Sequence, residues 1–194
     1  MGLIAEFRSD LRFYRKMNPQ KGFIGLLLDR PFLICANYRL GFWACRLTKP
    51  VVGTVMRAVY VMTNLIVSTM TGADIRSGAV IGQRFNVHTS FGIMIADGVV
   101  IGDDCRIYTG VCVVNKANFR HEGQPRIGNN VTLGVGCKII GGITVGDSAV
   151  VGANAVVLHD VPPYHMAVGV PAQNKPLPQD WAELQAAELA ELAT

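Results

Sequence analysis

The chain has 194 residues, of which 50% are hydrophobic and 16% charged. This composition excludes a disordered chain and supplies enough residues for one sizeable hydrophobic core. The net charge of +4 is uneven, because residues 1–70 carry +7 and residues 71–194 carry −3, so the first part is expected either to contact an anionic surface or to present a solvated helical face.

The cysteines and the apolar stretches indicate the cellular setting. The five cysteines lack CxxC or Cys/His metal spacing, so we expect reduced, buried thiols in a cytoplasmic protein. No signal peptide is expected, because the N-terminus is charged. The most apolar stretches, 22–36 and 51–72, are interrupted by polar residues, so no membrane span is predicted. Peripheral contact with a membrane surface stays open.

Residues 3–16 and 32–70 have the mixed three- and four-residue apolar spacing of helices. Pro19, Pro31 and Pro50 divide these stretches. The sequence therefore predicts two to four helices that end near Gly72.

From Ile75 onward, aliphatic residues recur every six positions. The thirteen repeats open at Ile75, Ile81, Val87, Ile95, Ile101, Ile107, Val113, Ile127, Leu133, Ile139, Val145, Val151 and Val157. Four residues after most of them comes a second small or aliphatic residue. A six-residue period predicts short strands on the faces of a prism, and three faces close one coil of a parallel β-helix.

The six-residue repeat is interrupted twice. Two extra residues occur between Val87 and Ile95, and two more between Val113 and Ile127. Each interruption carries a histidine, His88 in the first and His121 in the second. Loops that leave a regular scaffold often carry function, so both histidines are candidate site residues.

A proline-rich exit follows the repeats, and "DWAELQAAELAEL" then predicts a short helix with Asp180 as its N-cap. We expect a helical region over residues 1–72, a β-helix over 73–172 with a loop at 115–126, and a C-terminal tail and helix over 173–194.

Several segments resemble the bacterial hexapeptide acyltransferases, most closely the serine acetyltransferases and the polysaccharide O-acetyltransferases. These segments are "NPQKGF", "GADIRSGAVIGQRF" and "VTLGVGCKIIGGITVGDSAVVGANAVVLHDVPP". The resemblance implies a left-handed β-helix that forms homotrimers, with a dimer of trimers as a second arrangement. It also implies acetyl-CoA as a co-substrate bound between subunits, without a metal or a nucleic-acid partner.

The family's catalytic residues are only partly present. Asp74 matches its supporting aspartate, and Arg120-His121 matches an Arg-His pair in its extended loop. The family's Asp-His pair falls on His88-Thr89, so the histidine stands one position early and the aspartate of the pair is absent.

Transfer of an acetyl group to a hydroxyl needs a base, a donor for the oxyanion and alignment of both substrates. We hypothesise that His88 is the base, that Asp74 orients it through the other ring nitrogen, and that backbone N–H groups of the coil corners serve the oxyanion. His121 is the second candidate, as base or as a contact of the acceptor. The alternatives are solvated histidines and a turn-capping role for Asp74.

Asn18 and His88 replace two aspartates that the resemblance assigns to the ammonium group of serine. An unpaired buried cation is costly, so we expect a neutral hydroxyl of a sugar or polysaccharide precursor as the acceptor. Thr89, Arg120 and Asn18 are its expected contacts. The alternatives are serine O-acetylation in cysteine synthesis, a non-catalytic scaffold, and a metal enzyme like the β-helical carbonic anhydrases.

Small residues at the corners of the last coils are the expected binding place of acetyl-CoA. The predicted contacts are Asn115, Gly134, Val135, Gly136, Gly152, Ala153 and Lys175. The alternative is that the glycines only make the turns.

Overall fold

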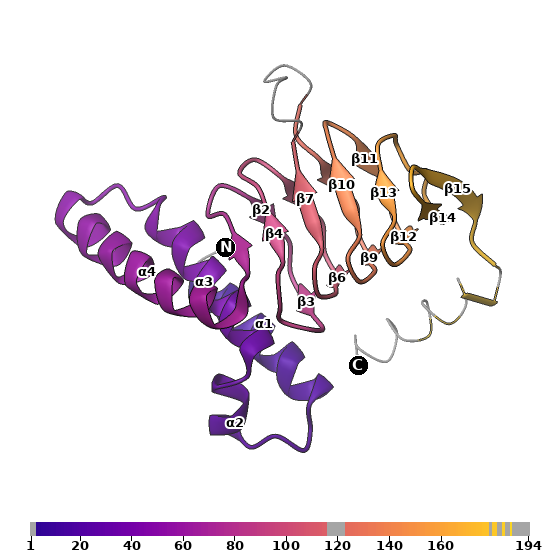
Figure 1. The fold of residues 1–194 in the computed structure, drawn as a ribbon. Helices are drawn as coiled ribbons and strands as arrows, with labels where there is room; N and C mark the ends of the chain where they lie inside the picture. Colours follow the sequence, from indigo (N-terminus) through magenta and orange to yellow (C-terminus); the bar gives the residue numbers. More distant parts are fainter. Residues whose placement is uncertain (1–2, 116–122, 179, 182–183, 185–186, 188–194) are drawn as a thin grey trace.

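The computed structural model describes residues 3–115, 123–178, 180, 181, 184 and 187. Four helices come first: α1 (Leu3–Met17), α2 (Phe23–Leu27), α3 (Arg30–Ala44) and α4 (Pro50–Thr71). Prolines open α3 and α4, and Gly72 ends α4 in the left-handed conformation at φ 62°. The predicted helical region is therefore confirmed. The helices gather at one end of the strands (Figure 1).

The strands form a β-helix with three parallel faces. They are β1 (Asp74–Ile75), β2 (Val80–Ile81), β3 (Asn86–Val87), β4 (Met94–Ile95), β5 (Val100–Ile101), β6 (Arg106–Ile107), β7 (Cys112–Val114), β8 (Arg126–Ile127), β9 (Thr132–Leu133), β10 (Lys138–Ile140), β11 (Thr144–Val145), β12 (Val150–Val151), β13 (Val156–Val157), β14 (His165–Gly169) and β15 (Ala172–Pro176). The sheets run β1-β4-β7-β10-β13, β2-β5-β8-β11 and β3-β6-β9-β12-β14-β15.

The six-residue repeat places one buried aliphatic residue in each of the first thirteen strands. All thirteen predicted positions are at most 5% exposed, which confirms the predicted core. Neither interruption shifts the phase, because Ile75 pairs in register with Ile95 and Ile101 pairs with Ile127. The extra residues therefore leave at corners and cost the core little.

Some details differ from the sequence expectations. Ile143, expected inside, is only partly buried, and Phe85 is a core residue that the pattern of small side chains missed. The proline-rich exit contains the hairpin β14–β15, and β15 crosses the expected boundary at 172–173. Asp180, Trp181, Leu184 and Ala187 are helical, as predicted for the C-terminus.

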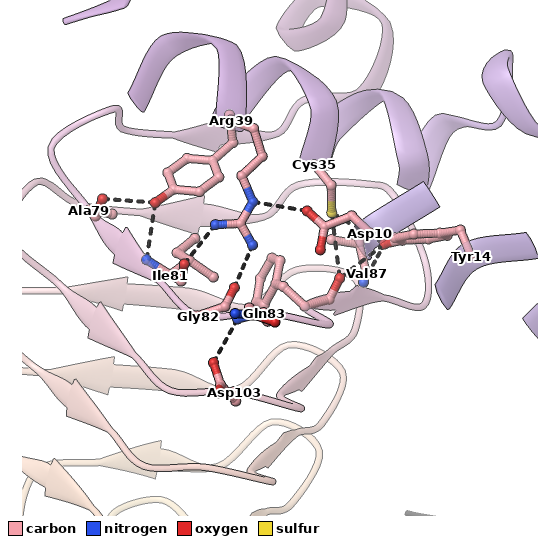
Figure 2. Close-up of polar contacts among 12 residues, drawn as sticks. Asp10, Tyr14, Cys35, Arg39, Ala79, Ile81, Gly82, Gln83, Val87 and Asp103 are labelled. Carbon is pink, nitrogen blue, oxygen red and sulfur yellow. Dashed lines mark hydrogen bonds and ion pairs between the residues drawn. The ribbon is translucent and has the colours of Figure 1, made fainter. Parts of the chain in front are cut away.

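Side chains of the helices bond the open backbone of the first coil (Figure 2). Tyr38 Oη donates to the Ala79 carbonyl at 2.9 Å and accepts from the Ile81 N–H at 3.0 Å. The Arg39 guanidinium donates to the carbonyls of Ile81, at 2.7 Å, and Gly82. These bonds cover an edge that would otherwise be free to pair with another strand.

Buried charges and thiols lie under this cap. Arg39 Nε contacts Asp10 Oδ2 at 2.9 Å, with both side chains 4% exposed, and the Asp10 carboxylate raises the pKa of Arg39 against the effect of burial. All five cysteines are free, as predicted, but Cys45 is exposed and Cys112 half-buried. Burial raises the pKa of the Cys35, Cys105 and Cys137 thiols to about 12, which keeps them protonated at neutral pH.

The helix α4 is long and apolar enough, by length and composition alone, to cross a membrane. Only 6% of its most apolar window is buried. The stretch 51–72 is therefore more apolar than expected from the sequence, although it contains the polar residues Arg57 and Asn64.

We predict that Arg39→Met lowers the free energy of unfolding by about 3–5 kcal/mol, because it leaves the Asp10 carboxylate buried without its cation. The matched control is Arg84→Met. Its pair with Asp104 is more exposed, at 37% and 19%, and should contribute about 1 kcal/mol or less. Urea unfolding followed by circular dichroism measures both. Equal losses in the two variants would contradict the prediction.

Candidate functional site

One edge of the β-helix carries most of the predicted site residues. We call it the His88 edge; it consists of the corners 88–93, 108–111, 134–137 and 152–155, which lead from β3 to β4, β6 to β7, β9 to β10 and β12 to β13. Backbone bonds link successive corners, from the Gly110 N–H to the Phe91 carbonyl and from the Asn154 N–H to the Val135 carbonyl, both at 2.8 Å. Neighbouring coils are about 4.8 Å apart. Gly134 and Gly152 therefore lie about 10 and 14 Å along the edge from His88.

His88 is exposed directly after the buried Val87. Its backbone N–H donates to the Ile107 carbonyl at 2.9 Å, so the strand ladder fixes its place. Its ring stacks on Tyr108 in the next coil, with ring centroids 4.8 Å apart and planes at 17°. The imidazole thus has one covered face and keeps access to solvent.

His88 borders a pocket of about 280 Å³ between the first coil and the helices. The pocket also contains Asn18, so the structure brings two predicted site residues together. Asn18 lies just beyond α1, and its Nδ2 donates to the Tyr14 carbonyl at 3.1 Å. The pocket therefore forms only where the helices meet the interrupted repeat.

Two charged residues of this pocket were missed by the sequence analysis. Lys21 Nζ and Asp29 Oδ2 are 2.8 Å apart, and their side chains are 38% and 18% exposed. Lys21 comes from the turn after α1, and Asp29 directly precedes α3. The sequence signal was Asp29-Arg30-Pro31, which was interpreted only as an interruption of the apolar stretch 22–36 and not as part of a site.

Tyr14 holds the backbone beside His88 (Figure 2). Its hydroxyl accepts from the Val87 N–H at 2.9 Å and donates to the Phe85 carbonyl at 3.3 Å, and it also lies 3.2 Å from Cys35 Sγ. Burial raises the pKa of Tyr14 well above its ordinary value, so the phenol keeps the proton that these bonds need. The helices thereby fix the position of the residue before His88.

The expected bond from Asp74 to His88 is not formed in the described part of the chain. Asp74 instead pairs with Arg76 at 3.2 Å, and both side chains are substantially exposed. Asp74 opens β1, and His88 follows β3 on another face, so the two residues flank a corner from opposite sides. An orienting role for Asp74 stays a prediction that requires a rearranged side chain.

Thr89 has a structural partner. Its Oγ1 accepts from the Thr109 N–H at 2.8 Å, and Thr109 Oγ1 donates to the Phe91 carbonyl at 2.6 Å. These bonds hold the enlarged corner closed. Contact between Thr89 and an acceptor stays a prediction.

The predicted acetyl-CoA residues are only partly gathered. Gly134, Val135, Gly136, Gly152 and Ala153 lie on the His88 edge. Lys175 is exposed on β15, at the end of the sheet that contains β3. Asn115 follows β7 and lies at a different edge, so the structure separates it from the others.

Three backbone N–H groups that were expected to bind the oxyanion already donate hydrogen bonds within the β-helix. The N–H groups of Gly134, Gly136 and Gly152 each donate at 2.8 Å to a carbonyl of an adjacent coil. These three groups are therefore not free to bind an oxyanion, and the expectation is wrong for them.

His121 and Arg120 lie outside the described residues. The described strands before and after them, β7 and β8, meet at a different edge from that of His88. Among the residues that the structure describes, no three histidine, cysteine or acidic side chains are close enough to hold a metal ion.

Residues 124–159 match the family described as bacterial transferase hexapeptide (six repeats). The chain belongs to the hexapeptide-repeat transferases. The chain is 30% identical to the serine acetyltransferase of Synechococcus elongatus over 171 residues, which cover 88% of the chain and 66% of the relative. The family and the β-helical fold predicted from the sequence are thus confirmed.

Solved structures give the same fold. Soybean serine acetyltransferase in its apoenzyme form superposes with a TM-score of 0.76 at 29% identity, covering 89% of this chain and 69% of that one. A serine acetyltransferase in complex with CoA gives 0.72 at 27% identity, covering 89% and 69%. The chain spans between 45% and 66% of the length of curated relatives that it matches.

We predict that Gly134→Ala lowers the free energy of unfolding by about 1–3 kcal/mol. A Cβ at Gly134 would lie 2.7 Å from the Val151 carbonyl oxygen and 2.9 Å from the Ala153 nitrogen. The matched control is Gly22→Ala, where a Cβ meets nothing within 4 Å, so its effect should stay within about 0.5 kcal/mol. Urea unfolding compares the two. An unchanged free energy of unfolding in Gly134→Ala would show that the close approach of the next coil does not require glycine at this position.

Proposed function

We propose that this chain is an acetyl-CoA-dependent O-acetyltransferase. The observation that carries the proposal is the exposed imidazole of His88 at a pocket mouth, on the same edge as the small corners of the last coils. The similar proteins named serine acetyltransferase, one of them solved with CoA, support both the reaction and the co-substrate.

In the proposed reaction, His88 accepts the proton of the acceptor hydroxyl while the hydroxyl oxygen bonds to the thioester carbonyl carbon. The carbon–sulfur bond of the tetrahedral intermediate then breaks. His88 returns its proton to the departing sulfur, which yields CoA and the acetyl ester. The stack on Tyr108 and the hydrogen bond from the Val87 N–H to the Tyr14 hydroxyl keep the imidazole at the pocket mouth.

L-Serine is the acceptor that the comparisons support best. The pocket adds a physical argument, because Asp29 supplies the negative charge that Asn18 and His88 lack. Lys21 lies beside it, so the pair presents one cation and one anion to a zwitterionic amino acid. Serine acetylation, the alternative in the sequence analysis, therefore becomes the first candidate.

A neutral sugar hydroxyl is the second candidate. Its support is the 2.8 Å contact between Lys21 and Asp29, which leaves the two charges already neutralised by one another. The remaining polar lining includes the amides of Asn18 and Asn86, which suit hydroxyl groups.

We propose a homotrimer as the working assembly. The His88 edge and the loop after β7 lie at different edges of one chain. Association around a three-fold axis would allow the loop of one copy, with Arg120 and His121, to approach the His88 edge of the next. A dimer of trimers and a cytoplasmic location also stay proposals.

We expect saturable acetylation of L-serine when the full chain is mixed with acetyl-CoA, measured by loss of the thioester absorbance and by product mass. A thiol reagent is unsuitable as the readout because Cys45 is exposed. Asp29→Asn should raise the KM for serine by about 10- to 100-fold, because it removes a hydrogen bond to a charged group. Turnover of free sugars but not serine would favour the second candidate, and turnover of neither would contradict the proposed function.

We predict that His88→Ala lowers kcat by about 10²- to 10⁴-fold, the usual contribution of a general base. The matched control is His159→Ala, which changes an exposed histidine outside the His88 edge and should leave kcat unchanged. Single-turnover measurements of acetyl transfer compare the variants. Full activity of His88→Ala would assign the base to another residue, with His121 the next to test.

A further inference from the structure

The helix α4 leaves a broad apolar face without a partner in the described chain. Of its 22 residues, only Gly53 and Thr71 are buried. Val55, Val59, Met62, Leu65, Ile66 and Met70 are between 43% and 62% exposed. A helix of this length is about 33 Å long. Soluble monomers rarely leave so large a continuous apolar surface uncovered.

Helical spacing places five of these six residues on one side of α4. Val55, Val59, Met62, Ile66 and Met70 follow one another at intervals of four, three, four and four residues, which places them on a single stripe. The more polar Asn64 lies on the opposite side, where its Oδ1 accepts from Asn37 Nδ2 of α3 at 2.9 Å. The apolar stripe therefore lies opposite Asn64, and its Ile66 and Met70 also line a groove next to α3.

An apolar groove lies beside this stripe. It has a volume of about 750 Å³ and runs between α1, α3 and α4, with Leu11, Leu40 and Val67 in its walls. Arg8 is the charged residue that lines it. The groove widens the apolar surface and places a guanidinium at its border.

Positively charged side chains lie beside the groove. Residues 1–70 carry a net charge of +7, and both described ion pairs of that region are internal, Asp10 with Arg39 and Lys21 with Asp29. Exposed cations include Arg8 and Arg12, one turn apart on α1, and Lys49 directly before α4. Arg57 is also exposed, but it lies two turns before Asn64 and therefore on the side of α4 opposite the stripe. The helical region is thus both apolar and basic.

We propose that the α4 stripe and the neighbouring groove bind the surface of a bilayer that contains anionic lipids. The valine, isoleucine and methionine side chains of the stripe would enter the acyl boundary, and Arg8 and Arg12 of α1 would meet lipid phosphates. A second copy of the chain would cover the apolar stripe but would bring the same +7 regions together. Charge complementarity therefore favours the anionic surface. The inference does not depend on the proposed acetyl transfer.

The test is co-flotation of the full chain with vesicles of phosphatidylcholine alone or mixed with phosphatidylglycerol. We expect binding to the mixed vesicles, with a loss when salt rises from about 0.1 M to about 1 M, because the Debye length falls from about 10 Å to about 3 Å. The variant Val55→Gln, Met62→Gln, Ile66→Gln should bind at least about 10-fold more weakly, because it removes apolar burial. Glutamine is a good helix former, so α4 should persist.

The matched control changes Val80, Leu158 and Leu184 to glutamine, three exposed apolar residues outside α4. It should float like the parent chain, and circular dichroism should show both triple variants folded. Equal binding to neutral and mixed vesicles, or unchanged flotation of the α4 variant, would overturn the proposal. The proposal would also be overturned if the parent chain did not float and the α4 variant lost oligomers that the parent chain forms. That result would assign the stripe to contact with a second copy. If the chain stayed with the vesicles after a carbonate wash at high pH, α4 would span the bilayer, and the proposal of surface binding would be overturned.

Discussion

The molecule depends on the bonds by which its helices satisfy the free backbone of the first coil. A β-helix exposes an unpaired edge at each end, and such an edge invites further strands. Here Tyr38, Arg39 and Tyr14 bond the groups of residues 79–87 directly, and Asp10 compensates the buried guanidinium. The helices are therefore part of the β-helix core and not an appended domain. At the other end, β15 returns antiparallel to β14, and the sheet ends in that hairpin.

The same contacts explain why the repeat is interrupted where it is. The two extra residues enlarge the corner after β3, and the hydrogen bonds of Thr89 and Thr109 hold that corner closed. His88 lies at its start, where Tyr14 fixes the preceding residue and Tyr108 supports the ring. The pocket is thus bounded on one side by the helices and on the other by the β-helix. Neither part alone would enclose an acceptor.

The sequence predicted the positions that follow from the six-residue repeat. It missed the pocket residues whose positions depend on how the helices pack on the β-helix. The thirteen aliphatic positions were predictable because an inward side chain must recur with the coil, and all thirteen are buried. Asp29 and Lys21 were not predictable as site residues, since 57 or more positions separate them from Val87-His88 and no local pattern encodes how α1 and α3 pack on β3. Asn115 lies at a different edge of the chain from the other predicted acetyl-CoA residues, because the spacing gives the coil but not the edge, and its contact with the co-substrate stays a prediction.

The position of the pocket at one end of the β-helix has an evolutionary consequence. The residues that line the pocket come mainly from the helical region, whereas the small corners of the later coils belong to the repeat alone. Substitutions in the segment between α1 and α3 would therefore alter the proposed acceptor pocket without disturbing the corners that are predicted to bind acetyl-CoA. A lineage could diversify its products by varying some fifteen residues around Asn18 and Asp29, while selection on the aliphatic column preserves the scaffold.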